Sequence, residues 1–517
     1  MNFLLLAVAF VASLTAGLCL TPLIRSASRR IGFTDKPDAH RKIHTHATAL
    51  GGGVAVIIAV FLGVLTPALI LESRATSQLR EHVGELAGLG AALLLISAVG
   101  LLDDFWQIRA RYKLLGQIAC AAVAVRSGLV IETITLAGET WPLGWLSEPL
   151  TIFWLVACMN ALNLIDGADG LASIVGISLC GTIAATSISL NNELSALVAI
   201  AVTGSLLGFL RYNFPPASIY LGDTGSMAIG LIAGSLTVHS SLKGAAAYAM
   251  TAPLAMWVIP LMDVGMAVIR RKLTGRGLSA TDRAHLHHCL LARGLGQRQL
   301  LALVGALCMF SGLGAWLTVR FGNGWFAAVS GLAVIGYLVS RRMFGHVELQ
   351  LAGQQLAQFG RQLRPRRRRA ASNSWQSQIR LQGIRGWEDL WAFLIEDAER
   401  LRISRLCLDI NIPWLHESYH ANWSSSAEAS QQPTPRLYWP LMAQGRPIGT
   451  LMLNGDADSC NVEWLEKLAE FLAVVQMRFS GLGVDLASLA AEPRAPDEHE
   501  AMSPESREAQ RGTFVGS

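Results

Sequence analysis

The sequence has little charge and few aromatic residues for its length. Of its 517 residues, 15% are charged and 7% are aromatic, whereas 52% are hydrophobic. A soluble chain of this length needs more charged side chains to cover its surface. The composition therefore excludes an ordinary soluble enzyme and indicates an integral membrane protein.

Several motifs are missing as well. The eight cysteines fall at neither metal-binding nor disulfide spacing, so we expect them to be small buried apolar side chains. No glycine-rich P-loop motif is present, which argues against an ATP site. The histidines of "DRAHLHH" (282–288) lack the i, i+4 spacing of a helical zinc site. The net charge of +5 does not indicate nucleic-acid binding, because the basic residues fall between apolar segments.

Long apolar runs dominate the first two thirds of the chain. A helix needs about 17 or more apolar residues to cross the hydrocarbon core, and about eleven segments meet that length. They lie roughly at 3–24, 50–71, 85–102, 114–131, 145–161, 171–190, 195–211, 219–238, 245–269, 300–320 and 325–341. The sequence therefore predicts an α-helical polytopic membrane protein.

The loops between these segments differ in charge. Most Lys and Arg residues fall in one alternating set of loops: 25–49, 103–113, 160–170, 212–218, 270–299 and everything after 342. By the positive-inside rule this set is cytoplasmic, so the amino terminus faces out. An odd number of spans then places the carboxyl terminus in the cytoplasm.

The region after the last apolar run has a different pattern. In 344–375, leucines recur every seven residues before an arginine run, which indicates an amphipathic helix on the anionic inner leaflet; a stop-transfer flank with a linker is the alternative. Residues 376–485 predict a small cytoplasmic α/β domain with the order helix, three strands, helix, similar to a ligand-sensing domain of the GAF type. The tail 486–517 is rich in Pro, Glu and Arg, which is typical of disorder.

Clusters of polar residues interrupt the apolar pattern, and all of them lie on the predicted cytoplasmic side. They are "DKPDAHRKIH" (35–44), "LDDFWQIRARYKLLGQ" (102–117), "NALNLIDGADGLA" (160–172), "YLGDTGS" (220–226), "IPLMD" (259–263) and "DRAHLHH". Each alone has an ordinary explanation, such as an interfacial helix cap, a turn or a solvent-facing histidine; Asp263 beside Pro260 could simply satisfy a broken helix. Together they indicate a functional site, because ionisable groups at membrane depth are rare.

The residue types in these clusters point to a divalent cation and phosphates. Mg²⁺ prefers one or two carboxylates together with phosphate oxygens. The candidate carboxylates are Asp103, Asp104, Asp166, Asp169 and Asp223. Lys42, Lys113 and Arg283 are the cations that would neutralise phosphate charge.

Over residues 1–343 the chain resembles the polyprenyl-phosphate N-acetylhexosamine-1-phosphate transferases. "DDFWQIRARYKLLGQ", "NALNLIDGADGLA", "YLGDTGS" and "DRAHLHH" match the family's motifs in the family's order. The resemblance implies transfer of a sugar-1-phosphate from a UDP-N-acetylhexosamine to undecaprenyl phosphate, with release of UMP and with Mg²⁺ or Mn²⁺ as cofactor. One departure is "THATALGGG" (45–53), where the family has prolines and often an arginine.

The resemblance also implies roles for single residues. Asp223 would be the metal ligand, and Asp103 the base acting on the lipid phosphate or, in a two-step mechanism, the nucleophile. Asn163, Asp166 and Asp169 would line the nucleotide end, while Lys113 and the histidine motif would hold phosphates. The full catalytic set is Asp103, Asp104, His285, His287 and His288. The full substrate-binding set is Lys42, His44, Lys113, Asn160, Asn163, Asp166, Asp169, Asp263 and Arg283.

"DRAHLHH" favours the family branch that uses UDP-GlcNAc over the branch that transfers phospho-MurNAc-pentapeptide. We therefore expect initiation of a cell-envelope polysaccharide at the bacterial inner membrane, with the active site in the cytoplasm. Expected partners are UDP-N-acetylhexosamine, undecaprenyl phosphate, membrane lipids, downstream glycosyltransferases contacting the C-terminal domain, and a second copy in a homodimer. Two other classes are a transporter and a regulatory membrane protein; the first predicts matching halves and the second needs no acidic cluster. Every catalytic candidate precedes residue 343, so a chain ending near Met343 is expected to keep its activity.

Overall fold

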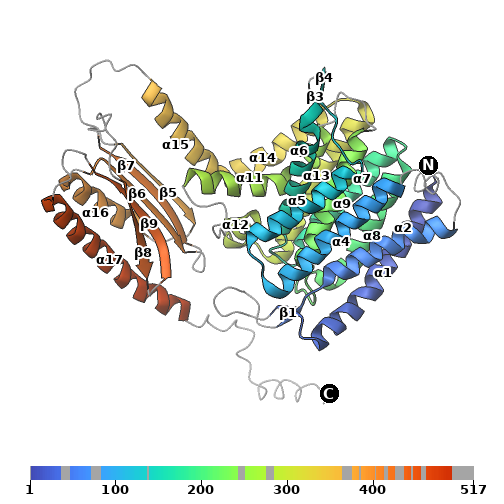
Figure 1. Cartoon of the computed structure of the whole chain (residues 1–517), viewed down its shortest axis with the longest axis horizontal. Helices are drawn as coiled ribbons and strands as arrows, with labels where there is room; N and C mark the ends of the chain where they lie inside the picture. The colour runs from blue at the N-terminus through green and yellow to red at the C-terminus, as the bar shows by residue number, and fades with distance from the viewer. Residues whose placement is uncertain are drawn as a thin grey trace, which may run out of the picture. The chain divides into compact units, whose positions relative to one another are not determined.

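The computed structural model divides the chain into two compact units, Met1–Arg364 and Pro365–Ser517, which are described separately (Figure 1). The structure describes residues 2–35, 47–70, 83–136, 139–242, 251–274, 284–363, 375–382, 386–401, 403–412, 417–425, 436–443, 446–455 and 462–491.

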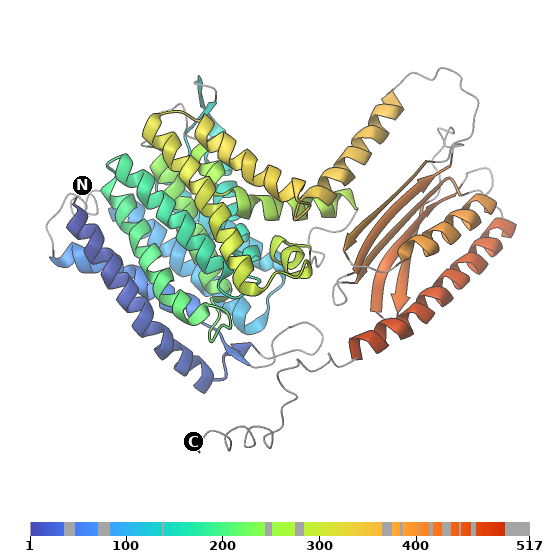
Figure 2. The ribbon, with the colours of Figure 1, turned by 180° about the vertical axis from the view of Figure 1, so that it is seen from behind.

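The first unit is a bundle of helices, seen from behind in Figure 2. Its helices are α1 (Phe3–Arg30), α2 (Gly52–Ile70), α4 (Val83–Trp106), α5 (Ala110–Arg126), α6 (Ser147–Ile165), α7 (Leu171–Ser189), α8 (Glu193–Asn213), α9 (Gly222–Leu242), α10 (Thr251–Met256), α11 (Val258–Leu273), α12 (Leu286–Ala292), α13 (Gln297–Phe321), α14 (Trp325–Ser340) and α15 (His346–Leu363). Two short hairpins, β1 (Thr34–Asp35) with β2 (Thr48–Ala49) and β3 (Thr133–Leu136) with β4 (Glu139–Pro142), lie at opposite ends of the bundle.

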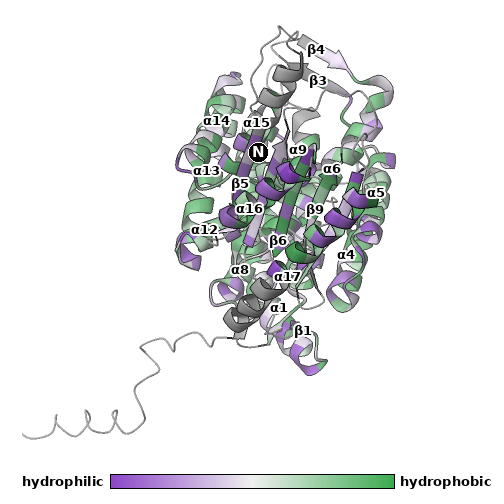
Figure 3. Cartoon of the chain, turned by 90° about the vertical axis from the view of Figure 1, so that its left-hand side faces the viewer, coloured by the Kyte–Doolittle hydropathy of each residue, from purple (hydrophilic) through white to green (hydrophobic). Residues whose placement is uncertain are grey.

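Hydrophobic residues run along the helices of this unit (Figure 3). Within the described residues, six helices are long and apolar enough to cross a membrane: Phe3–Arg30, Leu86–Trp106, Gly144–Ile165, Leu171–Ser189, Glu193–Asn213 and Gln297–Phe321. The helices Gly52–Pro67 and Trp325–Ser340 are apolar but shorter. Each of the eleven predicted segments coincides with a helix or, for 245–269, with parts of two helices, while the number that span stays a prediction.

The sequence predicted a single span over 245–269, whereas the described part of this segment forms two helices. It is divided at Trp257 into α10 and α11, and residues 243–250 lie outside the described part. Pro260 falls in the first turn of α11, where a helix does not need the N–H that proline lacks. Helix α11 carries Arg270, Arg271 and Lys272 in its last turn.

Helix α9 lies at the centre of the bundle and packs against α2, α4, α6, α7 and α8. Glycines allow the closest of these contacts. A Cβ on Gly53 of α2 would lie 2.3 Å from the backbone nitrogen of Gly225, and one on Gly100 of α4 would lie 2.4 Å from the Cα of Thr224. The "GGG" of 51–53 and the "GDTGS" of 222–226 are therefore packing motifs that fix the first turn of α9.

The chain after α14 belongs to the first unit. The sequence boundary was placed at 343, whereas the compact unit extends to Arg364 and includes α15. Leu349 and Leu356 of α15 are exposed, as an amphipathic helix on a membrane surface requires, and Leu351 is buried. The surface location of α15 stays a prediction.

The second unit holds a five-stranded antiparallel sheet with the strand order β5-β7-β6-β9-β8. Its strands are β5 (Trp375–Gln382), β6 (Arg405–Ile412), β7 (Glu417–Ser424), β8 (Arg436–Ala443) and β9 (Arg446–Asn454). Helices α16 (Trp387–Arg400) and α17 (Val462–Ala491) supply apolar side chains to its core. The sequence pattern predicted only three strands and missed β5 and β7, and it placed the start of the disordered tail inside α17.

Candidate active site

Four side chains from four helices meet around one ammonium group. Lys113 of α5 donates to Asp103 Oδ2 at the end of α4 (3.1 Å) and to Asn163 Oδ1 of α6 (2.9 Å), and it pairs with Asp223 in the first turn of α9. Asn163 Nδ2 in turn donates to Asp223 Oδ1 over 2.7 Å. Three oxygen-bearing side chains therefore surround one cation, as expected of a site that handles cations and phosphates.

Asp104 faces the first turn of α9 with both carboxylate oxygens. Oδ1 accepts from the Asp223 backbone nitrogen at 2.9 Å, and Oδ2 accepts from the Thr224 hydroxyl at 2.9 Å and the Thr224 nitrogen at 3.3 Å. A carboxylate at a helix N-terminus satisfies free N–H groups and opposes the positive end of the helix dipole. Gly222 permits this close approach, because a Cβ at this position would lie 2.7 Å from Asp104 Oδ2. Its φ of +74° also favours glycine. In this structure Asp104 therefore positions Asp223, and its catalytic role stays a prediction.

The polar side chains of "NALNLIDGADGLA" (160–172) make contacts in different parts of the first unit. Asn160 donates to Gln117 Oε1 over 2.7 Å inside the bundle, which makes it a packing residue. Asn163 joins the Lys113 cluster. Asp169 Oδ2 accepts from the Ala217 nitrogen at 2.9 Å and fixes the loop before α9. Asp166 follows the last residue of α6, and burial together with the charges of nearby aspartates raises its pKa well above the ordinary value.

Asp263 holds the histidine motif in place. Its Oδ2 contacts His285 Nδ1 at 3.1 Å, and its Oδ1 accepts from the Leu286 nitrogen at 2.7 Å. Asp263 is completely buried, and in this structure its carboxylate holds this segment, while its role in substrate binding stays a prediction. The broken-helix explanation is incomplete, because the carboxylate binds the residues that start α12.

His287 is buried against the acidic motif "DGADG" (166–170). Neither ring nitrogen has a hydrogen-bond partner among the described residues, and burial, reinforced by the charge of His288, lowers its pKa to about 3. A Cβ on Gly167 would lie 2.3 Å from His287 Nε2. The glycine of "DGADG" therefore makes room for the histidine of "HLHH", and the two motifs pack directly together.

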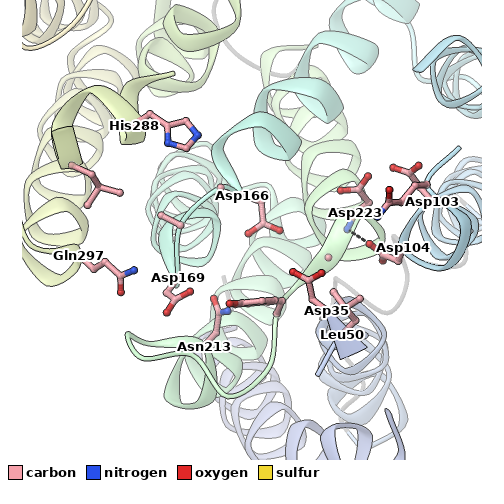
Figure 4. A pocket seen from close by; sticks show the side chains of 16 residues that line it. Asp35, Leu50, Asp103, Asp104, Asp166, Asp169, Asn213, Asp223, His288 and Gln297 are labelled. Atoms are coloured by element: carbon pink, nitrogen blue, oxygen red, sulfur yellow. Dashed lines mark hydrogen bonds between the residues drawn. The ribbon is translucent and has the colours of Figure 1, made fainter. Parts of the chain in front are cut away.

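These elements enclose a pocket of about 420 Å³ (Figure 4). Its lining comprises Asp35, Leu50, Asp103, Asp104, Gln107, Asp166, Gly167, Ala168, Asp169, Asn213, Tyr220, Gly222, Asp223, His288, Leu291 and Gln297. Figure 4 shows Asp103, Asp104 and Asp223 on one side and His288 on another, with Asp166 between them.

The sequence did not identify Asp35, Gln107, Asn213, Tyr220 or Gln297 as site residues. One of them carried a recognisable signal, because Asp35 opens the polar cluster 35–44. Gln107 is unusual only in its backbone, with a φ of +49°. Among the predicted residues, Lys42, His44 and Arg283 lie outside the described part of the chain.

The donor set fits a divalent cation. Within the described residues, no three His, Cys, Asp or Glu side chains form a ready metal cage. Mg²⁺ does not require one, since it binds through one or two carboxylates, waters and substrate phosphates. Asp223, with Asp103 and Asn163 beside it, supplies oxygen donors around a point that the Lys113 ammonium contacts in this structure.

Comparison with known proteins agrees with this geometry. The profile of glycosyl transferase family 4 matches residues 86–241, which include Asp103, Lys113 and Asp223. A probable undecaprenyl-phosphate N-acetylglucosaminyl 1-phosphate transferase of Bacillus subtilis is 36% identical over 302 residues, covering 57% of this chain and 80% of that protein. The chain belongs to glycosyl transferase family 4.

Two further relatives place the family 4 chain among phosphotransferases. A decaprenyl-phosphate N-acetylglucosaminephosphotransferase of Mycolicibacterium smegmatis is 31% identical over 350 residues, covering 62% of this chain and 83% of that protein. A phospho-N-acetylmuramoyl-pentapeptide-transferase of Shouchella clausii is 28% identical over 331 residues, covering 60% of this chain and 97% of that protein. The family resemblance inferred from the motifs is therefore confirmed.

Proposed function

We propose that this chain transfers N-acetylglucosamine-1-phosphate from UDP-GlcNAc to undecaprenyl phosphate and releases UMP. The observation that carries the proposal is the cluster of Asp103, Asn163 and Asp223 around Lys113 at a pocket lined by further aspartates. The names of the Bacillus and Mycolicibacterium relatives support this donor sugar and this class of lipid acceptor.

The reaction exchanges one phosphoanhydride for another. An oxygen of the lipid phosphate attacks the sugar-bearing phosphorus, a new P–O bond forms, and the bond from that phosphorus to the UMP oxygen breaks. The exchange is close to thermoneutral, so it needs no ATP. The barrier is partly electrostatic, because two phosphate charges about 4 Å apart repel by roughly 4 kcal/mol at an effective dielectric constant of about 20.

The residues of the chain lower this barrier by neutralising and orienting phosphates. Lys113 supplies a positive charge between Asp103 and Asp223. Asp103 faces the acceptor phosphate as base, or as nucleophile in a two-step mechanism. Asp166 and His288 face the pocket from the side where the nucleotide would bind.

Asp223 would hold Mg²⁺ or Mn²⁺, with Asn163 beside it. When bound, such an ion screens the negative charge of the phosphates. Asp104 contributes by fixing the backbone of Asp223, so that the carboxylate is in place before the substrate arrives.

We propose a bacterial inner-membrane location with about eleven spans and a cytoplasmic active site. The phosphate of a polyprenyl lipid lies at the headgroup plane, and catalytic groups at the ends of α4, α6 and α9 fit that depth. The α/β fold of 376–485 would serve as a docking module for downstream glycosyltransferases. A homodimer is a further expectation.

The test uses membranes containing the full chain, with undecaprenyl phosphate and either UDP-GlcNAc or UDP-MurNAc-pentapeptide. We expect equimolar UMP and lipid-linked GlcNAc, and no product with Asp223→Asn. Product only from UDP-MurNAc-pentapeptide would instead assign the chain to the peptidoglycan branch. No UMP from either donor, in membranes that contain the inserted protein, would overturn the proposal.

A further inference from the structure

Two polar links join residues 284–293, here called the histidine segment, to the chain that follows the last predicted span, 325–341. The first comes from Arg293, the residue directly after α12. Its guanidinium donates to the carbonyl oxygen of Arg341 over 3.3 Å and to that of Arg342. The carboxyl end of α12 is thus held by the chain just after α14.

The second link is a buried ion pair at the other end of the histidine segment. Arg270 of α11 pairs with Glu348 in the first turn of α15, and the same guanidinium donates to the carbonyl oxygen of Ala284 over 3.0 Å. Ala284 directly precedes His285. The two side chains are only 2% and 5% exposed, so water contributes little to solvating either charge.

The start of α15 is built to place Glu348 there. Phe344 is buried, and Gly345 adopts a φ of +80° that few other residues tolerate. A Cβ on Gly345 would also lie 2.8 Å from the Met262 methyl group of α11. The turn from α14 into α15 is therefore fixed against α11, next to Asp263, which binds His285 and Leu286.

We infer that Glu348 is a positioning residue for the histidine motif, acting through Arg270 and the Ala284 carbonyl. The inference rests on the proposed function, since it assigns this pair to the transferase site. Removing one partner of a buried ion pair removes a counterion from the other charge, and we expect the remaining side chain to rearrange. When Arg270 rearranges, its hydrogen bond to the Ala284 carbonyl is lost and the histidine segment loosens. The transferase therefore requires α15, and the boundary at 343 is too early.

The test uses the full chain in nanodiscs, with Glu348→Gln and Glu348→Ala. Gln350→Ala is the matched control, because Gln350 lies two residues further on α15 and is exposed. Amide exchange of 284–293 is measured by mass spectrometry and does not depend on activity. We expect faster exchange in both Glu348 variants and wild-type exchange in the control, with each protein monodisperse after purification.

Kinetics are then measured with UDP-GlcNAc and undecaprenyl phosphate. We expect kcat/KM for the nucleotide sugar to fall by about tenfold to a hundredfold, as for misplaced substrate-contacting groups. The KM for undecaprenyl phosphate is expected to stay within about twofold, because the Asp103 cluster is left intact. Glu348→Asp should recover part of both losses.

Unchanged exchange in 284–293 for Glu348→Ala would overturn the inference, whatever the activity. Faster exchange with an unchanged kcat/KM would also overturn it, because the histidine segment would then be loosened without consequence. A wild-type chain without UMP release, but with the expected exchange differences, would overturn the proposed function and leave the structural link standing.

Discussion

His287 makes the stability of the histidine segment depend on pH. Burial, reinforced by the charge of His288, lowers the pKa of His287 to about 3, whereas an exposed histidine titrates near about 6.5. The folded segment therefore keeps a neutral imidazole at pH 5, while the opened segment binds a proton there. Because the opened state binds more protons, stability falls as the pH falls from about 6.5 toward 3.

The size of the effect follows from the two pKa values. Between pH 7.5 and pH 5 the free energy of opening falls by about 2 kcal/mol, which corresponds to about a thirtyfold larger opened population. His285, His288 and Asp263 surround His287, so the comparison needs a variant that removes only the buried imidazole. His287→Leu does so, and because neither ring nitrogen has a partner among the described residues, the loss of the polar atoms is not destabilising in itself.

Amide exchange of 284–293, corrected for the intrinsic effect of pH, measures this opening. We expect protection in the wild type to fall by about thirtyfold between pH 7.5 and 5, and by much less in His287→Leu. His420→Leu is the control for the loss of a buried histidine outside the histidine segment. His420 belongs to the second unit, where it contacts Asp409 at 3.2 Å. An equal pH dependence in wild type and His287→Leu would refute the reasoning.

Four other substitutions test the first turn of α9 and the histidine segment. Asp223→Asn should abolish UMP release without affecting insertion; near-normal turnover at saturating Mg²⁺ would contradict its assignment. Asp104→Asn should weaken the start of α9 by about 1 kcal/mol and lower kcat, with faster exchange at the Asp223 and Thr224 amides; an unchanged kcat would count against positioning by Asp104. Gly167→Ala forces a Cβ to within 2.3 Å of His287 Nε2. It should weaken UDP-sugar binding measured by calorimetry, and His287→Ala should restore part of that binding; the absence of restoration would contradict the direct contact.

Much of the site could be predicted because ionisable residues are conspicuous where apolar segments end. Asp103, Lys113, Asn163 and Asp223 come from three separate motifs, and the structure brings them together. Hydropathy gave the positions of the helices, and loop charge gave one common side for the polar clusters. Neither depends on knowing which helix packs against which.

The remaining features depend on that packing. A carboxylate that binds a ligand and one that holds a helix N-terminus look the same in sequence, so the positioning contacts of Asp104 and Asp263 could not be predicted. Their hydrogen bonds to Thr224 and Leu286 become visible only in three dimensions. The contact of Glu348 with Arg270 was not predicted for a similar reason, because its helix was interpreted from its leucine spacing alone.

The two missed strands, β5 and β7, carry a larger share of polar residues than the three predicted strands. β5 ("WQSQIRLQ") and β7 ("ESYHANWS") carry mostly polar residues, yet they pair in register with each other and, through β7, with β6. Their polar residues are compatible with a strand because one face of the sheet packs against the apolar core that includes α16 and α17. Pattern alone favours strands in which apolar residues alternate along the whole length, such as β6.

The charge balance of the pocket is the reason why we expect a cation from outside its lining to bind there. Six aspartates line the pocket, and no Lys or Arg is among its lining residues in the described part of the chain. The hydrogen bonds of Asp104 and Asp169 to backbone N–H groups account for two of these carboxylates. Burial, together with the charges of Asp223, Asp104 and Asp169, raises the pKa of Asp166 well above its ordinary value, so negative charge is already unfavourable there. A diphosphate donor adds negative charge to this environment, so it is expected to bind together with a divalent cation, and Lys113 alone is too little to balance both.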